Sequence, residues 1–208
     1  MIYHQKLAFT LLLILVVINS CSQKIPLKKA INLNNMGVKC LMEFPTNDKT
    51  LDSAIIFFNQ ALQLDSTYVI AYMNLTTAYN RKHNYKNEML ILNKVIGLHY
   101  GSPQVILTKG MLFERMNNVD SAKQCYQTAD IKLQKKLIKN PNDVGLIEEL
   151  IFLKAIANGK DAAIAETNEQ IKKHPDLTSK LTGQYSFYKY FDRHNTIFGL
   201  PTEITSNK

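Results

Sequence analysis

The stretch Val69–Ser102, VIAYMNLTTAYNRKHNYKNEMLILNKVIGLHYGS, decides the fold of this chain. In its first part apolar residues such as Leu75 and Tyr79 stand three or four positions apart, which places them on one face of a helix. The second part repeats this spacing at Leu92 and Val95, after a polar segment. The stretch therefore predicts two antiparallel amphipathic helices joined by a turn.

The pattern of this stretch recurs with a period of 34 residues. Residues of matching size stand one period apart in these columns: Thr76 and Gly110; Tyr79 and Phe113; Phe58, Leu92 and Tyr126; Ala61, Val95 and Ala129. Ala54 and Ala122 lie two periods apart, and Glu88 interrupts their column. A period of this length is typical of arrays in which a helix pair buries its apolar side only against neighbouring pairs, so that about three or more are needed.

These columns resemble the tetratricopeptide-repeat (TPR) family. In that family a small residue of the first helix lets the second helix pack closely, and an aromatic residue one turn later fills the gap. Thr76 with Tyr79 and Gly110 with Phe113 match these positions, and Tyr72 stands where the family often has Trp. The resemblance implies an all-α fold: a right-handed superhelical array of antiparallel helix pairs with a C-terminal capping helix.

The predicted repeat domain spans residues 31–176 and holds about four units. Residues 31–44 resemble a first TPR helix with Gly37 in the small position, and the turn that follows is about five residues longer than in the family, which a surface turn tolerates. The helices of the fourth unit are expected over residues 144–157 and 160–174. That unit lacks the small and aromatic residues, so its helices are predicted on their own pattern.

Residues 177–208 break the period and are expected to form the capping helix and a flexible tail. The aromatic residues of Tyr185–Phe198 suit such a cap, because a terminal repeat needs its exposed apolar side covered. The alternative is that Ile197–Pro201, IFGLP, folds back into the groove of the array as a plug.

Three tripeptides, which begin at Asp52, Asp65 and Asp120, consist of Asp-Ser followed by Ala or Thr. All three lie at predicted helix starts, where N-capping explains them. They also resemble a sequence that some bacteria O-glycosylate on exported proteins.

The amino terminus carries a short polar start and an uninterrupted run, Leu7–Ile18, that is apolar except for Thr10. This run is too short for a membrane span, which needs about 20 apolar residues, and is typical of a signal peptide. The following Ile18-Asn19-Ser20-Cys21 places an aliphatic residue three positions before a cysteine and a small one directly before it. The alternative is an ordinary secretory signal with an incidental cysteine.

This arrangement resembles the bacterial lipoprotein signal. The resemblance implies that residues 1–20 are removed, that Cys21 is acylated with chains such as palmitate and holds the protein to a membrane, and that residues 21–30 form a tether. Ser22 resembles an outer-membrane address, and the basic residues after it favour the periplasmic face. We therefore expect a lipid-anchored protein of the bacterial cell envelope.

The formal net charge of the 208 residues is +8, which favours anionic lipid or an acidic protein as partner. Nucleic acid is not expected behind a secretion signal. Four lysines, spaced so that they share one helix face, extend the second helix of the third unit: Lys132, Lys135, Lys136 and Lys139. They form either a solvated face or a contact for anionic lipid or an acidic partner.

The sequence holds no pattern that indicates catalysis. There is no G-x-S-x-G, no Gly-rich phosphate loop and no Cys-x-x-Cys, and the histidines lack metal-ligand spacing. We therefore predict no enzyme, no cofactor, no metal and no small-molecule substrate. Cys40 and Cys125 are expected to be free thiols on apolar helix faces.

The TPR resemblance implies that the first helices line a concave groove for a peptide segment or a protein surface. The groove residues that it implies are Asn34, Val38, Met73, Asn74, Thr77, Arg81, Gln104, Leu107, Thr108, Met111 and Arg115. Only Asn74 matches the set with which some TPR proteins clamp a terminal carboxylate. The leading hypothesis is a periplasmic adaptor or assembly lipoprotein. The alternatives are an immunity-type antagonist of a toxin or lytic enzyme, and a hydrolase subunit or weak enzyme, for which the sequence names no residues.

Overall fold

The computed structural model describes residues 26–43 and 47–198, without the side chains of His99 and Tyr100. All regular elements in these ranges are helices, which confirms the predicted all-α fold for the part of the chain that the structure describes. In chain order they are α2 (Lys28–Met42), α3 (Asp48–Leu64), α4 (Val69–Arg81), α5 (Tyr85–Val95), the π-helix η1 (Ile96–Tyr100), α6 (Pro103–Arg115), α7 (Val119–Lys139), α8 (Val144–Asn158), α9 (Lys160–Lys173), the 3-10 helix η2 (Pro175–Leu177), α10 (Thr178–Lys189) and α11 (Arg193–Phe198).

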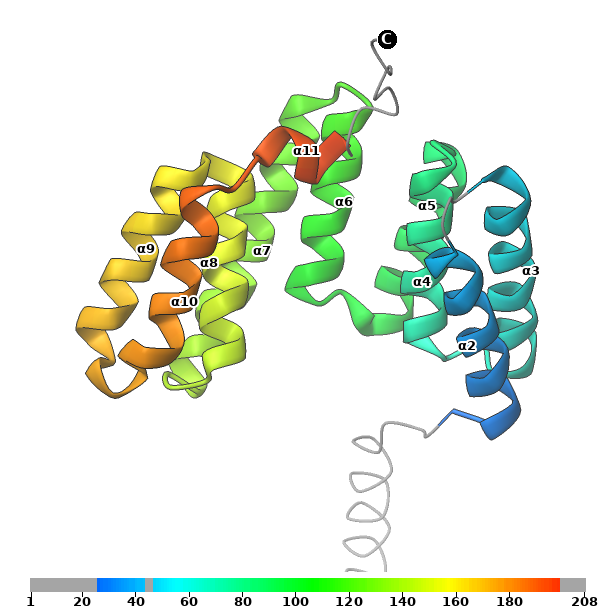
Figure 1. The fold of residues 1–208 in the computed structure, drawn as a ribbon, viewed down its shortest axis with the longest axis horizontal. Coiled ribbons are helices and arrows are strands. Elements are labelled where there is room, and N and C mark those ends of the chain that lie inside the picture. The colour runs from blue at the N-terminus through cyan, green and yellow to red at the C-terminus, as the bar shows by residue number, and fades with distance from the viewer. Residues whose placement is uncertain (1–25, 44–46, 199–208) are drawn as a thin grey trace, which may run out of the picture.

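The described helices form antiparallel pairs that follow one another along the array, as the period predicts (Figure 1). The pairs are α2–α3, α4–α5, α6–α7 and α8–α9; α3 packs on α4, and α7 packs on α8. Helix α10 packs against α9, whereas α11 turns back to lie against α6 and α8. The array is therefore of the predicted TPR type, with helices closing its carboxyl end.

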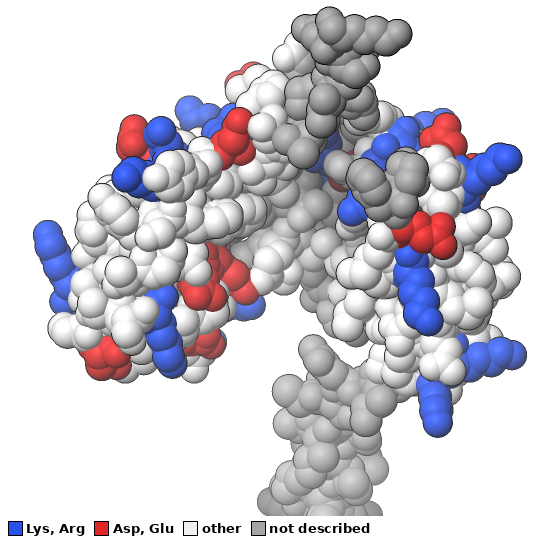
Figure 2. All heavy atoms as spheres, in the orientation of Figure 1, with Lys and Arg blue, Asp and Glu red and all other residues white. Residues whose placement is uncertain are grey.

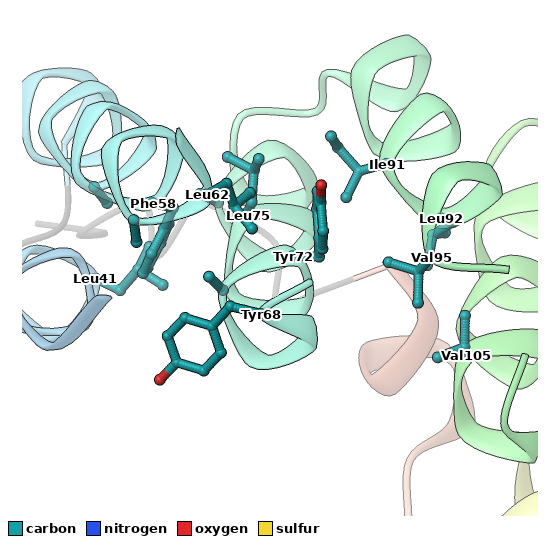
Figure 3. Packing of buried hydrophobic residues seen from close by; sticks show 14 of the residues in the cluster. Leu41, Phe58, Leu62, Tyr68, Tyr72, Leu75, Ile91, Leu92, Val95 and Val105 are labelled. Carbon is teal, nitrogen blue, oxygen red and sulfur yellow. The ribbon is translucent and has the colours of Figure 1, made fainter. Parts of the chain in front are cut away.

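One buried apolar cluster extends from the first pair to α6 and so spans the two halves of the arch in Figure 1. Figure 3 shows Phe58 and Leu75 packed among the first two pairs, and Leu92 and Val95 of α5 facing Val105 of α6. These residues belong to one buried cluster. Each pair thus hides its apolar side on its neighbours, as expected for a repeat array.

Two glycines allow the helices of a pair to approach closely. An added Cβ at Gly37 would lie 2.5 Å from the ring of Phe58, and one at Gly110 would lie 2.5 Å from the ring of Tyr126. The same contact occurs in the first and third units, although the turn between α2 and α3 is longer. The predicted position of Gly37 in the small slot is confirmed.

The period is also visible in the turns between the helices of a pair. His83 and Asn117, 34 positions apart, are the non-glycine residues with positive φ in the described chain, at 53° and 60°. The next residue in each turn is the N-cap of the following helix: the side chain of Asn84 accepts from the amide of Asn87, and that of Asn118 from the amide of Ser121. Histidine and asparagine both tolerate left-handed backbone, and the asparagine that follows caps the next helix, so the two turns are built alike.

The prediction that the Asp-Ser tripeptides are helix caps is wrong. Helix α3 begins earlier, at Asp48, and its N-cap is Asn47, which exchanges hydrogen bonds with Thr50 in a capping box. In the second tripeptide the carboxylate of Asp65 accepts from the amide and hydroxyl of Thr67, which stabilises the turn before α4. Helix α8 does have an aspartate cap, since the carboxylate of Asp143 accepts from the amide of Leu146.

The first described helix begins at Lys28, inside the segment expected to be a tether, because Ala30 is fully buried against the array. The predicted signal peptide and Cys21 lie outside the described residues. At the other end, Leu181 and Tyr188 of α10 are buried, and Phe191 packs edge-on against Phe152 of α8. Tyr188 and Phe191 thus help to cover the last pair, whereas Tyr185, Phe187 and Tyr190 are exposed.

Candidate functional site

The first helices of the pairs carry the predicted groove residues, and two of these residues join neighbouring units. Asn74 Nδ2 on α4 donates to Asn34 Oδ1 on α2 at 2.8 Å. Asn34 is buried, and Asn74 is partly exposed. This bond fixes the first unit against the second at the surface where a partner would lie.

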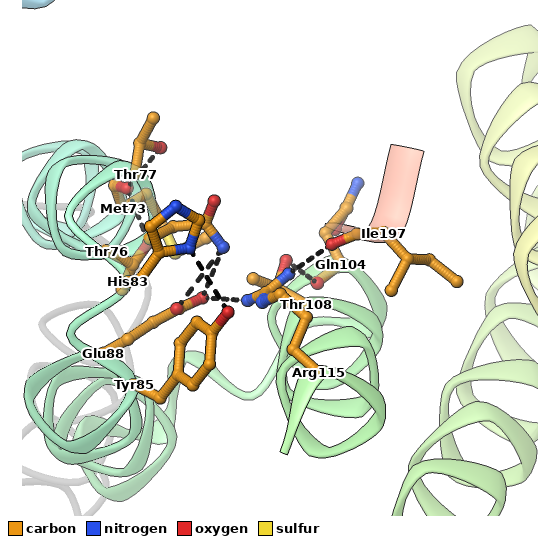
Figure 4. A network of polar contacts seen from close by, with 11 residues as sticks. Met73, Thr76, Thr77, His83, Tyr85, Glu88, Gln104, Thr108, Arg115 and Ile197 are labelled. Atoms are coloured by element: carbon orange, nitrogen blue, oxygen red, sulfur yellow. Dashed lines mark hydrogen bonds and ion pairs between the residues drawn. The ribbon is translucent and has the colours of Figure 1, made fainter. Parts of the chain in front are cut away.

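The two arginines of the groove, Arg81 and Arg115, occupy equivalent positions but have different partners. Arg81 Nη1 donates to the carbonyl of Leu41, at the end of α2, at 2.6 Å. Arg115 Nη2 lies 2.5 Å from Glu88 Oε1, and its Nη1 donates to the carbonyl of Ile197 at 3.1 Å (Figure 4). Arginine thus ties the array to a neighbouring segment in both units.

Glu88 and Arg115 form a buried ion pair between α5 and α6. The side chains are only 1% and 5% exposed, respectively. The side-chain amide of Asn80 also contacts the guanidinium. When its oxygen faces Arg115, that oxygen accepts a hydrogen bond from Arg115 Nη2 at 2.7 Å. Burial raises the pKa of the Glu88 carboxyl, and the positive charge of Arg115 opposes that rise. The ring of Tyr85, whose centroid is 5.8 Å from the guanidinium carbon, completes the surroundings.

Sequence reasoning missed the importance of Glu88, although the signal was present. Glu88 interrupts the column of Ala54 and Ala122, and both alanines are buried. A carboxylate at a buried position of a repeat needs a partner, because an unpaired buried charge is strongly destabilising. Arg115 of the next unit is that partner.

Helix α11 covers part of the surface formed by the first helices. Ile197 is 2% exposed and packs with Leu107 of α6 and Leu150 of α8. Arg193 donates to the carbonyl of Ile156 and pairs with Glu114 at 2.8 Å. The described part of the predicted plug, residues 197–198, therefore lies against α6 and α8, whereas residues 199–201 fall outside the described chain.

An open hollow of about 630 Å³ lies between α4 and the pair α6–α7. It contains two predicted groove residues, Met73 and Gln104, together with Val69 of α4 and Val105 of α6. In Figure 2 the molecule is hollowed between its two halves. The hollow thus includes a part of the predicted groove, at Met73 and Gln104.

The remaining groove residues lie around these features. Leu107 is buried beneath α11, while Val38, Thr108 and Met111 are partly exposed. Thr77 is exposed, and its hydroxyl donates to the carbonyl of Met73. The structure thus separates the predicted set into residues that hold the array together and residues that a partner can reach.

A second cavity, of about 280 Å³, lies between α7 and α8. Tyr126 Oη donates to Glu114 Oε2 at 2.8 Å, and Arg193 binds the same carboxylate. Burial and the neighbouring Glu114 raise the pKa of Tyr126, so the phenol stays protonated and serves as a donor. Lys154 pairs with Asp130 at 2.9 Å across the same cavity. These contacts join α6, α7, α8 and α11, and each carboxylate among them has a cationic partner.

Cys40 and Cys125 are free and partly buried, and burial raises the pKa of both thiols. In the described ranges no group of three or more His, Cys, Asp and Glu side chains is arranged to hold a metal ion. None of the described helices combines the length and the apolar character needed to cross a membrane.

No family model matches the chain, and no curated protein matches it. Among solved structures it is similar to YrrB, described as a TPR protein with an unusual peptide-binding site, at 18% identity over 81% of this chain and 82% of that one, with a TM-score of 0.41. It is also similar to MamA (17% identity, 82% and 92% covered, TM-score 0.43) and to TTC0263, a TPR protein of Thermus thermophilus (15%, 78% and 100%, TM-score 0.40). At these identities and TM-scores the likeness transfers no residue of a site and no role to this chain.

Proposed function

We propose that this chain is a lipid-anchored interaction module of the bacterial envelope, an adaptor or assembly protein without catalysis. Its open hollow would hold a peptide segment or part of a protein surface. The observation that carries this proposal is the hollow between α4 and α6–α7, which holds Met73 and Gln104 of the predicted groove.

The size and the lining of the hollow support a binding role. A volume of about 630 Å³ falls within the range of about 300–1,000 Å³ that is typical of ligand sites. Val69 and Met73, both partly exposed, supply apolar surface, and the flexible thioether of Met73 can adapt to different side chains. Such a surface suits side chains of a docked segment.

Site-specific photo-crosslinking tests this function. Benzoylphenylalanine in place of Gln104, in the hollow, should trap a partner in envelope membranes, whereas the same residue in place of Gln60, exposed on α3, should not. Subunits of one envelope assembly in the trapped product would support the adaptor. A single toxin or lytic enzyme would indicate the antagonist instead, and equal products from both positions would contradict binding in the hollow.

Acylation of Cys21 is a separate part of the proposal, supported by the sequence around that residue. We expect the wild-type protein to remain in the membrane fraction after a high-salt wash, because two or more acyl chains anchor stably. The Cys21→Ser protein should move to the soluble fraction, while a Cys40→Ser control should stay membrane-bound. A Cys21→Ser protein that is still firmly membrane-held would contradict the anchor.

The residues after Cys21 support an outer-membrane position facing the periplasm. Ser22 resembles the outer-membrane address, and the following segment is basic rather than acidic. External protease should therefore leave the protein intact in whole cells and digest it once the outer membrane is permeabilised. Digestion in intact cells would place it on the cell surface.

A further inference from the structure

Three of the four lysines on the extension of α7 line the hollow. Lys132, Lys135 and Lys136 are spaced three and four positions apart, so their side chains leave the helix on the same side. All three are exposed, and none forms an ion pair with a carboxylate in the described part of the chain. They therefore place positive charge at the hollow that no ion pair among the described residues neutralises.

One carboxylate, that of Glu149 on α8, lies near these lysines. Glu149 is partly buried, and burial raises the pKa of its carboxyl. The positive charge of Lys136 and the side chain of Gln104 both lower the pKa of this carboxyl and so oppose that rise. Glu149 offsets at most one of the three positive charges, so the hollow keeps a positive excess.

The wall opposite the lysines is apolar. Val69 and Met73 of α4 face the hollow, and Pro103 and Val105 close it near the start of α6. The amino-terminal end of α6 adds a partial positive charge to that of the lysines. The hollow thus joins a cationic wall to an apolar wall.

We propose that the hollow binds an acidic peptide segment of a partner protein, with Asp or Glu side chains on Lys132, Lys135 and Lys136 and an apolar side chain against Val69 and Met73. The proposal rests on the binding function proposed above and adds the chemistry of the partner. A peptide can enter a recess between two halves of an arch, whereas a flat bilayer reaches protruding surfaces. Charge complementarity and the recessed position therefore favour a peptide over a lipid surface.

The test uses fluorescence anisotropy with the mature chain and two short labelled peptides, one of alternating Glu and Leu and one of alternating Gln and Leu. The Glu peptide should bind more tightly, and its affinity should fall with added salt. Replacement of the three lysines of the hollow by Glu should weaken binding by about tenfold or more. A control with the same net charge replaces three exposed lysines elsewhere: Lys49, Lys86 and Lys172.

The control should keep most of the affinity, and circular dichroism should show equal helicity for both variants. Equal affinity of the two triple variants, or equal binding of the two peptides, would overturn the proposal. Loss of sedimentation with phosphatidylglycerol vesicles, without loss of peptide binding, would assign the lysines to lipid and overturn it as well. A partner that is crosslinked through position 104 in both triple variants would leave the adaptor function standing and refute only the acidic chemistry.

Discussion

Replacing Arg115 by Met is expected to lower the free energy of unfolding by about 3–5 kcal/mol. Met fills much of the space of the arginine stem but leaves the carboxylate of Glu88, 1% exposed, without its cationic partner. The change also removes the hydrogen bond from Arg115 to the carbonyl of Ile197, so α11 is bound less tightly to α6. Urea unfolding followed by circular dichroism measures the loss.

Two further variants separate the buried charge from other effects. The double variant Glu88→Leu/Arg115→Met removes both charges and should recover much of the lost stability, since an apolar replacement of a buried ion pair is often close to neutral. Lys173→Met breaks the exposed pair with Glu169 and should change stability only slightly, because exposed pairs are screened by water. The single variant Glu88→Leu completes the cycle. If the stability loss of the double variant equals the sum of the losses of Glu88→Leu and Arg115→Met, the two side chains are not coupled as the structure indicates.

The loss of stability of the Arg115→Met protein relative to the wild type, called its deficit below, should also depend on pH. Burial holds the pKa of Glu88 above its ordinary value, and removing the guanidinium raises it further. The folded variant then binds a proton more tightly than the unfolded chain, so its stability falls as the pH rises from the ordinary carboxyl pKa of about 4.3 through the folded pKa. The deficit should therefore be smaller at about pH 5 than at about pH 8; a constant deficit would contradict a charge effect at Glu88.

Replacing Gly110 by Ala is expected to destabilise the protein by about 1–3 kcal/mol through overpacking. In an exposed helix interior the same change stabilises by about 1 kcal/mol, because Ala is the better helix former. At Gly110 the new Cβ would lie 2.5 Å from the ring of Tyr126 and 3.1 Å from the Cβ of Cys125. The ring cannot move away easily, because it is buried and its hydroxyl is bonded to Glu114.

Gly183 provides the matched control, since it lies within α10 and a Cβ there would meet nothing within 4 Å. Gly183→Ala should raise the stability, because Ala is the better helix former, and the two variants should therefore shift the thermal midpoint in opposite directions. A Gly110→Ala protein that is as stable as the wild type would show that α6 and α7 can separate without cost, contrary to the close packing of this pair.

Much of the array was predictable because its signals are local and repeated. The helix faces of the central stretch follow from spacing, and Gly37 was assigned to the small position because residues 31–44 resemble a first TPR helix. In the structure Gly37 faces the ring of Phe58, as Gly110 faces that of Tyr126. The helix caps were misassigned, since Asp, Ser and Asn all cap helices and several of them stood near each boundary. Which of them accepts the amide hydrogen bond depends on where the preceding turn ends, as at Asn47 and Asn118.

The candidate site was predictable only in outline. A resemblance identifies the helices that line a groove, but it does not reveal that α11 returns over α6 or that Arg115 is shared by Glu88 and Ile197. The lysines of α7 were recognised as one face from their spacing alone. That they line a hollow depends on the distance between α4 of one unit and α6 of the next. The spacing of residues within a helix does not determine this distance.

By itself the sequence determined that this chain builds helix pairs, because the period of 34 residues and the apolar faces within it leave each pair dependent on its neighbours. It also determined the signals at the amino terminus that underlie the proposed anchor. Only the tertiary structure decided which polar residues form contacts between helices inside the array and which line the hollow. The physical reason is that ion pairs and hollows arise between segments far apart in the chain, as for Arg115 and Ile197, where no local spacing records them.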